Sequence, residues 1–348
     1  MTFDRRHALQ TLLVGGLASA CATRPAVREP LVSINLTDVQ PPEAPTTGTR
    51  LETAFDNARR MTVPVRLGNR GPFQFVVDTG ANRTVIGIET AERCSLASDG
   101  IAPVHGIVGT QPAPLVKVPM LKVGLVRSAN LSLPALPKAS LGADGLLGID
   151  VLKNRRMRLN FRSNTFEIGP SGRGAAVQSL GGTGGTRIPD PTRGIVVPAQ
   201  YRSGQLVIFD ADVAGVPVRA FLDSGAQITC GNEALRDHLI QYRPELAQRM
   251  VQTQLISATG QTSSALLGPL PRLRLGGMGL NNIRAAFAPL HIFSLWGLND
   301  KPAMLVGIDV LRHFDEVTLD FGRREVIFMR ARSTNAPGGR ASADVRSG

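Results

Sequence analysis

The sequence predicts a mostly β fold in which one unit occurs twice. An apolar strand that ends in Asp-Thr-Gly-Ala or Asp-Ser-Gly-Ala occurs at 73–81 and again at 218–226. An apolar pair followed by Gly-Ile-Asp-Val-Leu occurs later in each half, at 145–152 and 304–311. Between these motifs, short apolar runs alternate with turn residues, as in strands of a β protein. Several matches in the same order and register indicate an internal duplication.

Segments of different composition separate and flank the two halves. At 348 residues the chain is long enough for two domains of ordinary size. The stretches around the halves are rich in Gly, Pro and Thr, a composition typical of spacers. The predicted organisation is an export signal at 1–20, a Pro-rich tether at 21–50, an N-terminal lobe at 51–168, a Gly/Pro-rich linker at 169–194, a C-terminal lobe at 195–330 and a disordered tail at 331–348.

The first residues have the layout of a bacterial export signal. Arg5 and Arg6 precede a short apolar stretch at 12–18, which is too short to span a membrane. Two processing routes fit the residues that follow. Ala-Ser-Ala at 18–20 is a site for the general signal peptidase, and Cys21 is alternatively the lipidated first residue of a lipoprotein. Both routes predict an exported, periplasmic protein, and the second also predicts a lipid anchor in the membrane.

Local patterns predict the main elements of each half. Strand signals occur at 31–36, 61–67, 115–123 and 206–213. Helical signals are brief, at 89–97 and 232–248. Pro244 divides the second of these into two helices, because Pro suits the first turn of a new helix. The prediction is therefore an all-β class with a few short helices.

Composition excludes several classes of site. The net charge is +12, but the Lys and Arg residues are scattered and form no basic run interleaved with aromatic residues. We therefore expect no nucleic-acid partner. No C-x-x-C or H-E-x-x-H spacing occurs, so we expect no metal and no cofactor. In an oxidising compartment Cys94 and Cys230 either form a disulfide or remain as buried free thiols.

The paired motifs resemble those of the retropepsin-like aspartic proteases, in a single-chain bacterial form with two tandem repeats. The resemblance rests on the Asp-[Thr/Ser]-Gly-Ala elements at Asp78 and Asp223 and on the later apolar-apolar-Gly elements at 146–148 and 305–307. A glycine-containing hairpin lies between the two motifs in each half. The resemblance implies a two-lobed acid-protease fold with pseudo-twofold duplicated β-barrel lobes. In this family the second motif threads behind the catalytic loop.

The same resemblance implies the chemistry. Asp78 and Asp223 would be the catalytic carboxylates, one from each half of a monomer with internal pseudo-twofold symmetry. Two neighbouring carboxylates share one proton, so the ionised partner can activate water while the other stabilises the oxyanion. This reaction requires no cofactor. The expected function is that of an aspartic endopeptidase acting on protein or peptide substrates, with a role in processing periplasmic or envelope proteins.

Residues around the two aspartates match the family by position. Thr79 and Ser224 offer hydroxyls that lock the two loops together, and Gly80 and Gly225 allow tight turns. The expected flaps over a bound peptide are glycine-containing hairpins around Gly106, Ile107, Gly109, Thr259 and Gly260.

One departure from the pepsin-type enzymes concerns acidity. Ala81 and Ala226 stand where those enzymes commonly carry a hydroxyl residue. A carboxylate without that hydrogen bond is less acidic, so we expect a pH optimum near about 5–7.

Several recurring residues have structural interpretations. Asp150 and Asp309 follow the second motif and are expected to cap short helices. The histidines His105, His238, His291 and His313 share no spacing and are expected to be structural or surface residues, and Trp296 either packs in the core or lines a substrate pocket. A catalytically silent peptide-binding protein is the alternative function. An actin-like ATPase is disfavoured because no further Gly/Thr-rich phosphate loop follows either aspartate motif.

Overall fold

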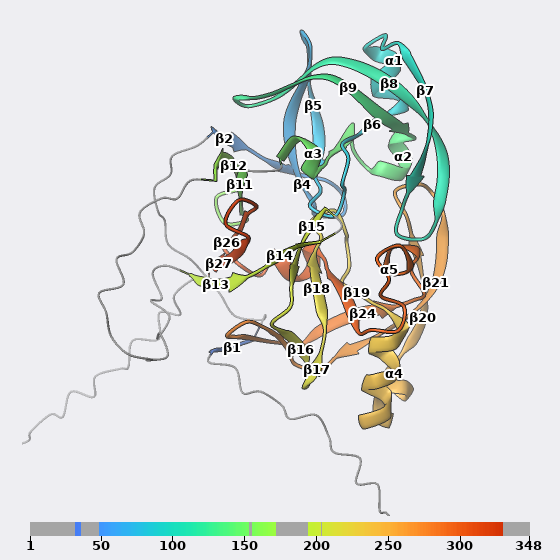
Figure 1. Ribbon diagram of the computed structural model, residues 1–348, viewed down its shortest axis with the longest axis vertical. Coiled ribbons are helices and arrows are strands. Elements are labelled where there is room, and N and C mark those ends of the chain that lie inside the picture. The colour runs from blue at the N-terminus through green and yellow to red at the C-terminus, as the bar shows by residue number, and fades with distance from the viewer. Residues whose placement is uncertain (1–31, 36–48, 153–154, 172–193, 203, 330–348) are drawn as a thin grey trace, which may run out of the picture.

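A computed structural model describes residues 32–35, 49–152, 155–171, 194–202 and 204–329. Within them the chain is mostly β, as the repeated strand patterns predict. The expected export signal, Cys21 and the expected tail lie outside the described residues, as does most of the expected linker. Two lobes lie one above the other in Figure 1, the N-terminal lobe at the top and the C-terminal lobe below.

An eight-stranded sheet builds most of the N-terminal lobe. Its strand order is β3-β4-β5-β10-β6-β9-β8-β7, and β4 also pairs with β8, which closes six of the strands into a barrel. The strands are β3 (Ala54–Phe55), β4 (Met61–Leu67), β5 (Arg70–Val77), β6 (Val85–Gly87), β7 (Ser98–His105), β8 (Thr110–Val123), β9 (Val126–Leu136) and β10 (Gly145–Leu147).

The C-terminal lobe repeats this order, β14-β15-β18-β25-β19-β24-β21-β20, strand for strand. Its strands are β14 (Gln200–Arg202), β15 (Gln205–Ile208), β18 (Arg219–Leu222), β19 (Cys230–Gly231), β20 (Val251–Ile256), β21 (Thr262–Leu270), β24 (Ile283–Phe287) and β25 (Ala303–Val306). A further five-stranded sheet contains β1 (Val32–Asn35), β23 (Met278–Asn281), β22 (Leu273–Leu275), β16 (Ala211–Val213) and β17 (Val216–Pro217). The strand signal at 206–213 is thus split between β15 and β16.

A six-stranded sheet joins the two lobes. Its order is β13-β27-β26-β11-β12-β2, and β11 of the first half pairs antiparallel with β26 of the second. The strands are β2 (Thr49–Glu52), β11 (Arg155–Asn160), β12 (Thr165–Pro170), β13 (Ile195–Pro198), β26 (Glu316–Asp320) and β27 (Glu325–Met329). The strand order is nearly symmetric about the β11–β26 pair, so the sheet fixes the two lobes in a pseudo-twofold relation (Figure 1).

Helices are short and lie between the strands. They are α1 (Ile88–Arg93), α2 (Lys138–Leu141), α3 (Ile149–Leu152), α4 (Glu233–Tyr242), the 3-10 helix η1 (Pro244–Arg249), α5 (His291–Leu295) and α6 (Ile308–Leu311). Asn232 caps α4 by accepting a hydrogen bond from Leu235 N at 3.0 Å, and Pro244 opens η1, as its position predicts. None of the helices in the described ranges is long and apolar enough to cross a membrane.

The cores of both lobes bury the apolar sides of these strands. Trp296 belongs to this packing: it stacks on Phe221 with ring centroids 4.1 Å apart and meets Phe293 edge to face. Of its two expected locations, the core is the correct one. Cys94 and Cys230 are buried free thiols in different lobes, which settles the choice between a disulfide and free thiols.

The expected role of Asp150 and Asp309 as helix caps is correct only in part: Val151 N donates to Asp150 at 2.9 Å and Val310 N donates to Asp309 at 3.0 Å, but neither aspartate is the N-cap residue. Each lies in the first turn of its helix, and α6 instead has Gly307 at the N-cap with no side-chain cap bond. The carboxylates also accept hydrogen bonds from the residues just before β6 and β19: Thr84 Oγ1 donates to Asp150 at 2.7 Å and Thr229 Oγ1 donates to Asp309 at 2.8 Å. These bonds tie each short helix to the segment that follows an aspartate loop.

Candidate active site

Each predicted catalytic aspartate follows directly on the buried end of a strand. Asp78 follows β5 and Asp223 follows β18. The second motif of each half passes behind the loop: β10 runs parallel to β5, and β25 runs parallel to β18. Asp78 N donates to Leu147 O and Asp223 N donates to Val306 O, both at 3.0 Å. The threading that the resemblance implies is therefore present twice.

Crossed hydrogen bonds join the two loops. Thr79 Oγ1 donates to Leu222 O at 2.8 Å and accepts from Ser224 N at 3.0 Å. Ser224 Oγ donates to Val77 O at 2.6 Å and accepts from Thr79 N at 3.1 Å. Both hydroxyls are buried. Because each one holds the opposite loop, the two aspartates are fixed relative to each other.

The two carboxylates have matching backbone donors. Asp78 Oδ1 accepts from the N–H groups of Gly80 at 2.9 Å and Ala81 at 3.0 Å. Asp223 Oδ1 accepts from Gly225 at 2.9 Å and Ala226 at 3.0 Å. The methyl side chains at positions 81 and 226 cannot supply a further donor.

Glycine is required in both loops because the opposite aspartate lies against it. A Cβ added to Gly80 would lie 2.4 Å from Asp223 Cγ, and one added to Gly225 would lie 2.3 Å from Asp78 Cγ. Such distances are far inside van der Waals contact. Each glycine thus makes room for the carboxylate of the other lobe, which brings residues 145 positions apart in the sequence into one site.

Burial and proximity set the protonation of the pair. Asp78 is 9% exposed and Asp223 is 7% exposed, and each carboxyl lies against the glycine that follows the other aspartate loop's hydroxyl residue. Burial, followed by the negative charge of Asp78, raises the pKa of Asp223 to about 8. Burial also raises the pKa of Asp78, opposed by the N–H of Gly80 and by the charge of Arg60. The pair therefore holds one proton over a window that ends near pH 8.

The two expected flaps are hairpins whose tips meet. Gly106 N donates to Gly109 O at 2.8 Å in the tip between β7 and β8, and Ser257 N donates to Gln261 O at 2.8 Å in the tip between β20 and β21. A Cβ on Gly106 would lie 2.2 Å from Ser257 Oγ. Gln261 Nε2 donates across to Thr110 O at 3.4 Å.

The apolar residues of the two tips pack on opposite lobes. Ile107 packs against a core cluster of the C-terminal lobe, and Ala258 packs against one of the N-terminal lobe. Thr259 is buried in the second tip, where its hydroxyl donates to Ser257 Oγ at 3.0 Å. Gly260 has a φ of +83°, so the turn there favours glycine.

A histidine pair that shares no sequence spacing holds the first tip. His105 Nδ1 lies 3.0 Å from His291 Nε2, and Thr110 Oγ1 lies 2.9 and 3.1 Å from the two nitrogens. The two ring planes are nearly parallel, and their centroids are 5.3 Å apart. Because the facing nitrogens are closer to each other than the centroids are, the rings meet edge to edge. His291 begins α5, which fastens the first tip to the C-terminal lobe (Figure 1).

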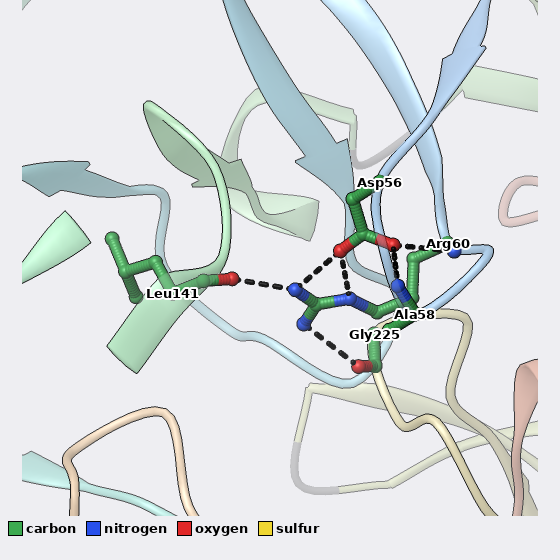
Figure 2. Close-up of polar contacts among 5 residues, drawn as sticks. All are labelled: Asp56, Ala58, Arg60, Leu141 and Gly225. Atoms are coloured by element: carbon green, nitrogen blue, oxygen red, sulfur yellow. Dashed lines mark hydrogen bonds and ion pairs between the residues drawn. The ribbon is translucent and has the colours of Figure 1, made fainter. Parts of the chain in front are cut away.

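Two further polar side chains reach the aspartate loops, and neither belongs to a recognisable motif. Arg60 donates through Nη1 to Gly225 O at 3.3 Å, and Gln205 donates through Nε2 to Gly80 O at 2.9 Å. Figure 2 shows Arg60 between Asp56, Leu141 and Gly225. In the part of the chain that the structure describes, no group of three or more His, Cys, Asp or Glu side chains is arranged to hold a metal ion.

Comparison with family models assigns both halves of the chain. Residues 63–154 match the gag-polyprotein aspartyl protease family, and residues 209–310 match the family described as aspartyl protease. Each matched range includes one aspartate loop and its threading strand. No curated protein sequence matches the chain. The chain therefore belongs to the retropepsin-like aspartyl proteases, as a single chain that carries two tandem repeats of the family domain.

Proposed function

We propose that the protein is an active aspartic endopeptidase whose catalytic groups are Asp78 and Asp223. The observation that carries the proposal is the geometry of the two buried carboxylates, each of which lies against the glycine of the opposite loop and accepts matched backbone N–H bonds. Thr79, Gly80, Ser224 and Gly225 support the dyad, since they complete the crossed bonds and the close approach.

The reaction needs only the dyad and one water molecule. The ionised carboxylate takes a proton from water while the water oxygen bonds to the scissile carbonyl carbon. The protonated carboxyl passes its proton to the carbonyl oxygen, which avoids a free oxyanion. When the C–N bond breaks, the nitrogen receives the proton held by the first carboxylate, and a hydroxyl of the intermediate returns a proton to the second. The dyad is then back in its starting state.

The protonation of the dyad predicts the pH range of activity. Below the raised pKa of Asp78 both carboxyls are protonated and no base is present. Above about pH 8 both are ionised and no acid is present. Activity should therefore fall at both ends of this window, and the optimum at about pH 5–7 expected from Ala81 and Ala226 lies below its upper end.

The two hairpin tips are proposed to act as flaps over a bound peptide. Their contacts with each other and with opposite lobes support this role, because substrate entry would have to separate them. The proposed flap residues are those at the tips: Gly106, Ile107, Gly109, Thr259 and Gly260.

Export to the periplasm and processing of envelope proteins complete the proposal. They are supported by the N-terminal signal pattern and by Cys21 as a lipidation site. Fractionation of cells expressing the full chain, with and without Cys21→Ser, tests this point. Membrane association that is lost in the variant supports a lipid anchor, and a cytoplasmic location contradicts export.

Cleavage of a diverse peptide library by residues 22–348 across pH 3–8 tests the activity. We expect the wild type to cleave, a statine-type inhibitor to block cleavage, and Asp78→Asn and Asp223→Asn each to abolish it. Binding of peptides by folded wild-type protein without cleavage at any pH would instead favour the catalytically silent alternative.

A further inference from the structure

Arg60 and Gln205 occupy the same position in the two repeats. In the β4–β5 ladder Thr62 is opposite Val76, so the residue two places earlier, Arg60, lies opposite Asp78. In the β15–β18 ladder Val207 is opposite Phe221, so Gln205 lies opposite Asp223. One repeat therefore places a cation beside its aspartate where the other places a neutral amide.

Both side chains cross the interface to the same kind of acceptor. Arg60 reaches the carbonyl oxygen of Gly225, and Gln205 reaches that of Gly80 and also the amide oxygen of Asn82 at 2.9 Å. Gly225 is the residue that lies against the Asp78 carboxyl. The guanidinium bonded to Gly225 is therefore close to Asp78, and its charge acts to lower the pKa of that carboxyl.

Arg60 is rigidly held beside the dyad. Its side chain is buried, with the residue 7% exposed, and Asp56 Oδ2 accepts from Nε at 2.7 Å and from Nη2 at 2.6 Å (Figure 2). Leu141 O accepts from Nη2 at 2.5 Å. Gly142 leaves no room for a side chain there, since an added Cβ would lie 2.8 Å from Nη2. The ion pair with Asp56 offsets part of the positive charge of Arg60, but it also fixes the position of the guanidinium beside the dyad.

The charged groups around the two carboxyls therefore differ. Asp78 faces Asp223 and the Arg60–Asp56 pair, whereas the leading influences on Asp223 are burial, the charge of Asp78 and two loop N–H groups. Asp223 also lies near the thiol of Cys230, whose pKa is raised by burial first and then by the charge of Asp223. Burial and mutual repulsion act on both members of the dyad, and the cation favours a negative charge at Asp78.

We infer that Arg60 breaks the symmetry of the dyad, so that Asp78 carries the negative charge and Asp223 holds the proton. Resting on the proposed function, this assigns Asp78 as the base that takes the proton from water and Asp223 as the acid that protonates the carbonyl oxygen. Arg60 is then a positioning residue: it touches neither substrate nor reacting atoms but selects which carboxylate is ionised.

A titration that does not depend on catalysis tests the inference. With ¹³C-labelled aspartate in the full chain, Asp223→Asn leaves Asp78 as the only dyad carboxyl, and Asp78→Asn leaves Asp223. We expect Asp78 to titrate at lower pH than Asp223. Arg60→Gln should raise the Asp78 pKa by about one unit, whereas Arg60→Lys should keep it low. An unchanged Asp78 pKa in Arg60→Gln would overturn the inference.

Two further variants act as internal checks on this titration. Asp56→Asn keeps the shape of the partner but frees the charge of Arg60, so the Asp78 pKa should fall, opposite to the effect of Arg60→Gln. Gln205→Ala removes the matched bond to Gly80 without changing any charge, and the Asp78 pKa should not move. If Arg60→Gln does not fold, the two Asn variants still decide the question, because an Asp78 that titrates no lower than Asp223 overturns the inference.

The pH profile of kcat/KM extends the test to activity. Arg60→Gln should move the acid limb up by about one pH unit and Arg60→Lys should restore it, while Gln205→Ala should lower activity without moving the limb. A loss of activity in Arg60→Gln with an unmoved limb would mean that Arg60 only braces the loop. Wild-type protein that cleaves nothing would contradict the proposed function, and the titration would still decide the role of Arg60.

Discussion

The two lobes are nearly identical at the dyad and differ increasingly away from it. Each crossed hydroxyl bond, and each N–H bond to the Asp78 and Asp223 carboxylates, has a counterpart in the other loop whose length differs by at most 0.2 Å. Two carboxylates that share one proton need mutual rigidity, which the crossed bonds supply only if both loops keep the same form. The chemistry therefore accounts for the conserved twofold geometry at this point of the molecule.

Away from the dyad, the two lobes differ in whether their long strands are continuous or interrupted. β8 runs for 14 residues and β9 for 11 in the N-terminal lobe, whereas the corresponding region of the C-terminal lobe is divided into β21 and β22 and into β23 and β24. Pro271 follows β21, and Asn282, with a φ of +60°, separates β23 from β24. The barrel order survives these breaks, so strand order is retained more strictly than strand length.

Removal of the crossed hydroxyls should have the largest effect on stability. Comparison of the two single variants tests whether the two loops contribute equally. Thr79→Val and Ser224→Ala each leave a buried carbonyl and a buried N–H unpaired, and each should lower the free energy of unfolding by about 2–4 kcal/mol. The double variant should cost less than the two singles together, because the residues form one network. Denaturant unfolding measures all three.

Thr90→Val is the matched control for the crossed hydroxyls. The buried Thr90 hydroxyl has no hydrogen-bond partner among the described residues, so its removal should cost little. A cost in Thr79→Val no larger than in Thr90→Val would mean that the crossed bonds do not hold the loops.

Removal of either carboxyl should stabilise the protein at alkaline pH, and we expect the two variants to differ in how much stability they gain. The folded pKa of Asp223 is about 8, far above its ordinary value of 3.8, so the folded state holds a proton that the unfolded chain has released. The contribution of Asp223 to stability is therefore fully present below about pH 4 and is lost as pH rises towards 8. Asp223→Asn should gain about 1–3 kcal/mol at pH 8, and Asp78→Asn less, because Arg60 then loses its neighbouring charge. Thermal unfolding at pH 5 and pH 8 measures both, and an equal gain would contradict the asymmetry.

The flaps should differ in how each is held. His291→Ala removes the contact that fastens the first tip to α5, and we expect KM to rise about threefold to tenfold with little change in kcat, as for the loss of one or two hydrogen bonds. His238→Ala is the control, since His238 lies exposed on α4 and contacts the carbonyl of Ala234 on its own helix. A KM in His291→Ala equal to that of the control would argue against closure by this contact.

Restoring a hydroxyl near each carboxylate should have the smallest effect. The N–H of Ala81 bonds to Asp78 and that of Ala226 bonds to Asp223, so a serine side chain at either position lies within reach of the same carboxylate. A donor to the charged form lowers a pKa, and we expect Ala81→Ser to move the acid limb of kcat/KM down by about half a pH unit. Ala226→Ser should move it less if Asp78 is the ionised partner. An upward shift in either variant would contradict this explanation of the acidity.

Much of this protein follows from its sequence alone. The two Asp-[Thr/Ser]-Gly-Ala loops and their threading strands are local patterns repeated in register, and local chemistry also sets the start of α4 at Asn232 and of η1 at Pro244. The mostly β class and the duplicated order could be predicted because strand periodicity is a property of neighbouring residues.

Only the tertiary structure decides what the pseudo-twofold axis brings together. His105 and His291 are 186 positions apart, and Arg60 and Gly225 are 165 apart, so no local pattern marks either pair. Arg60 and Gln205 are recognisable as partners only from strand register, which places each opposite an aspartate. The sequence determines that two like carboxyls meet, whereas long-range packing decides which groups surround each one and therefore how their charges differ.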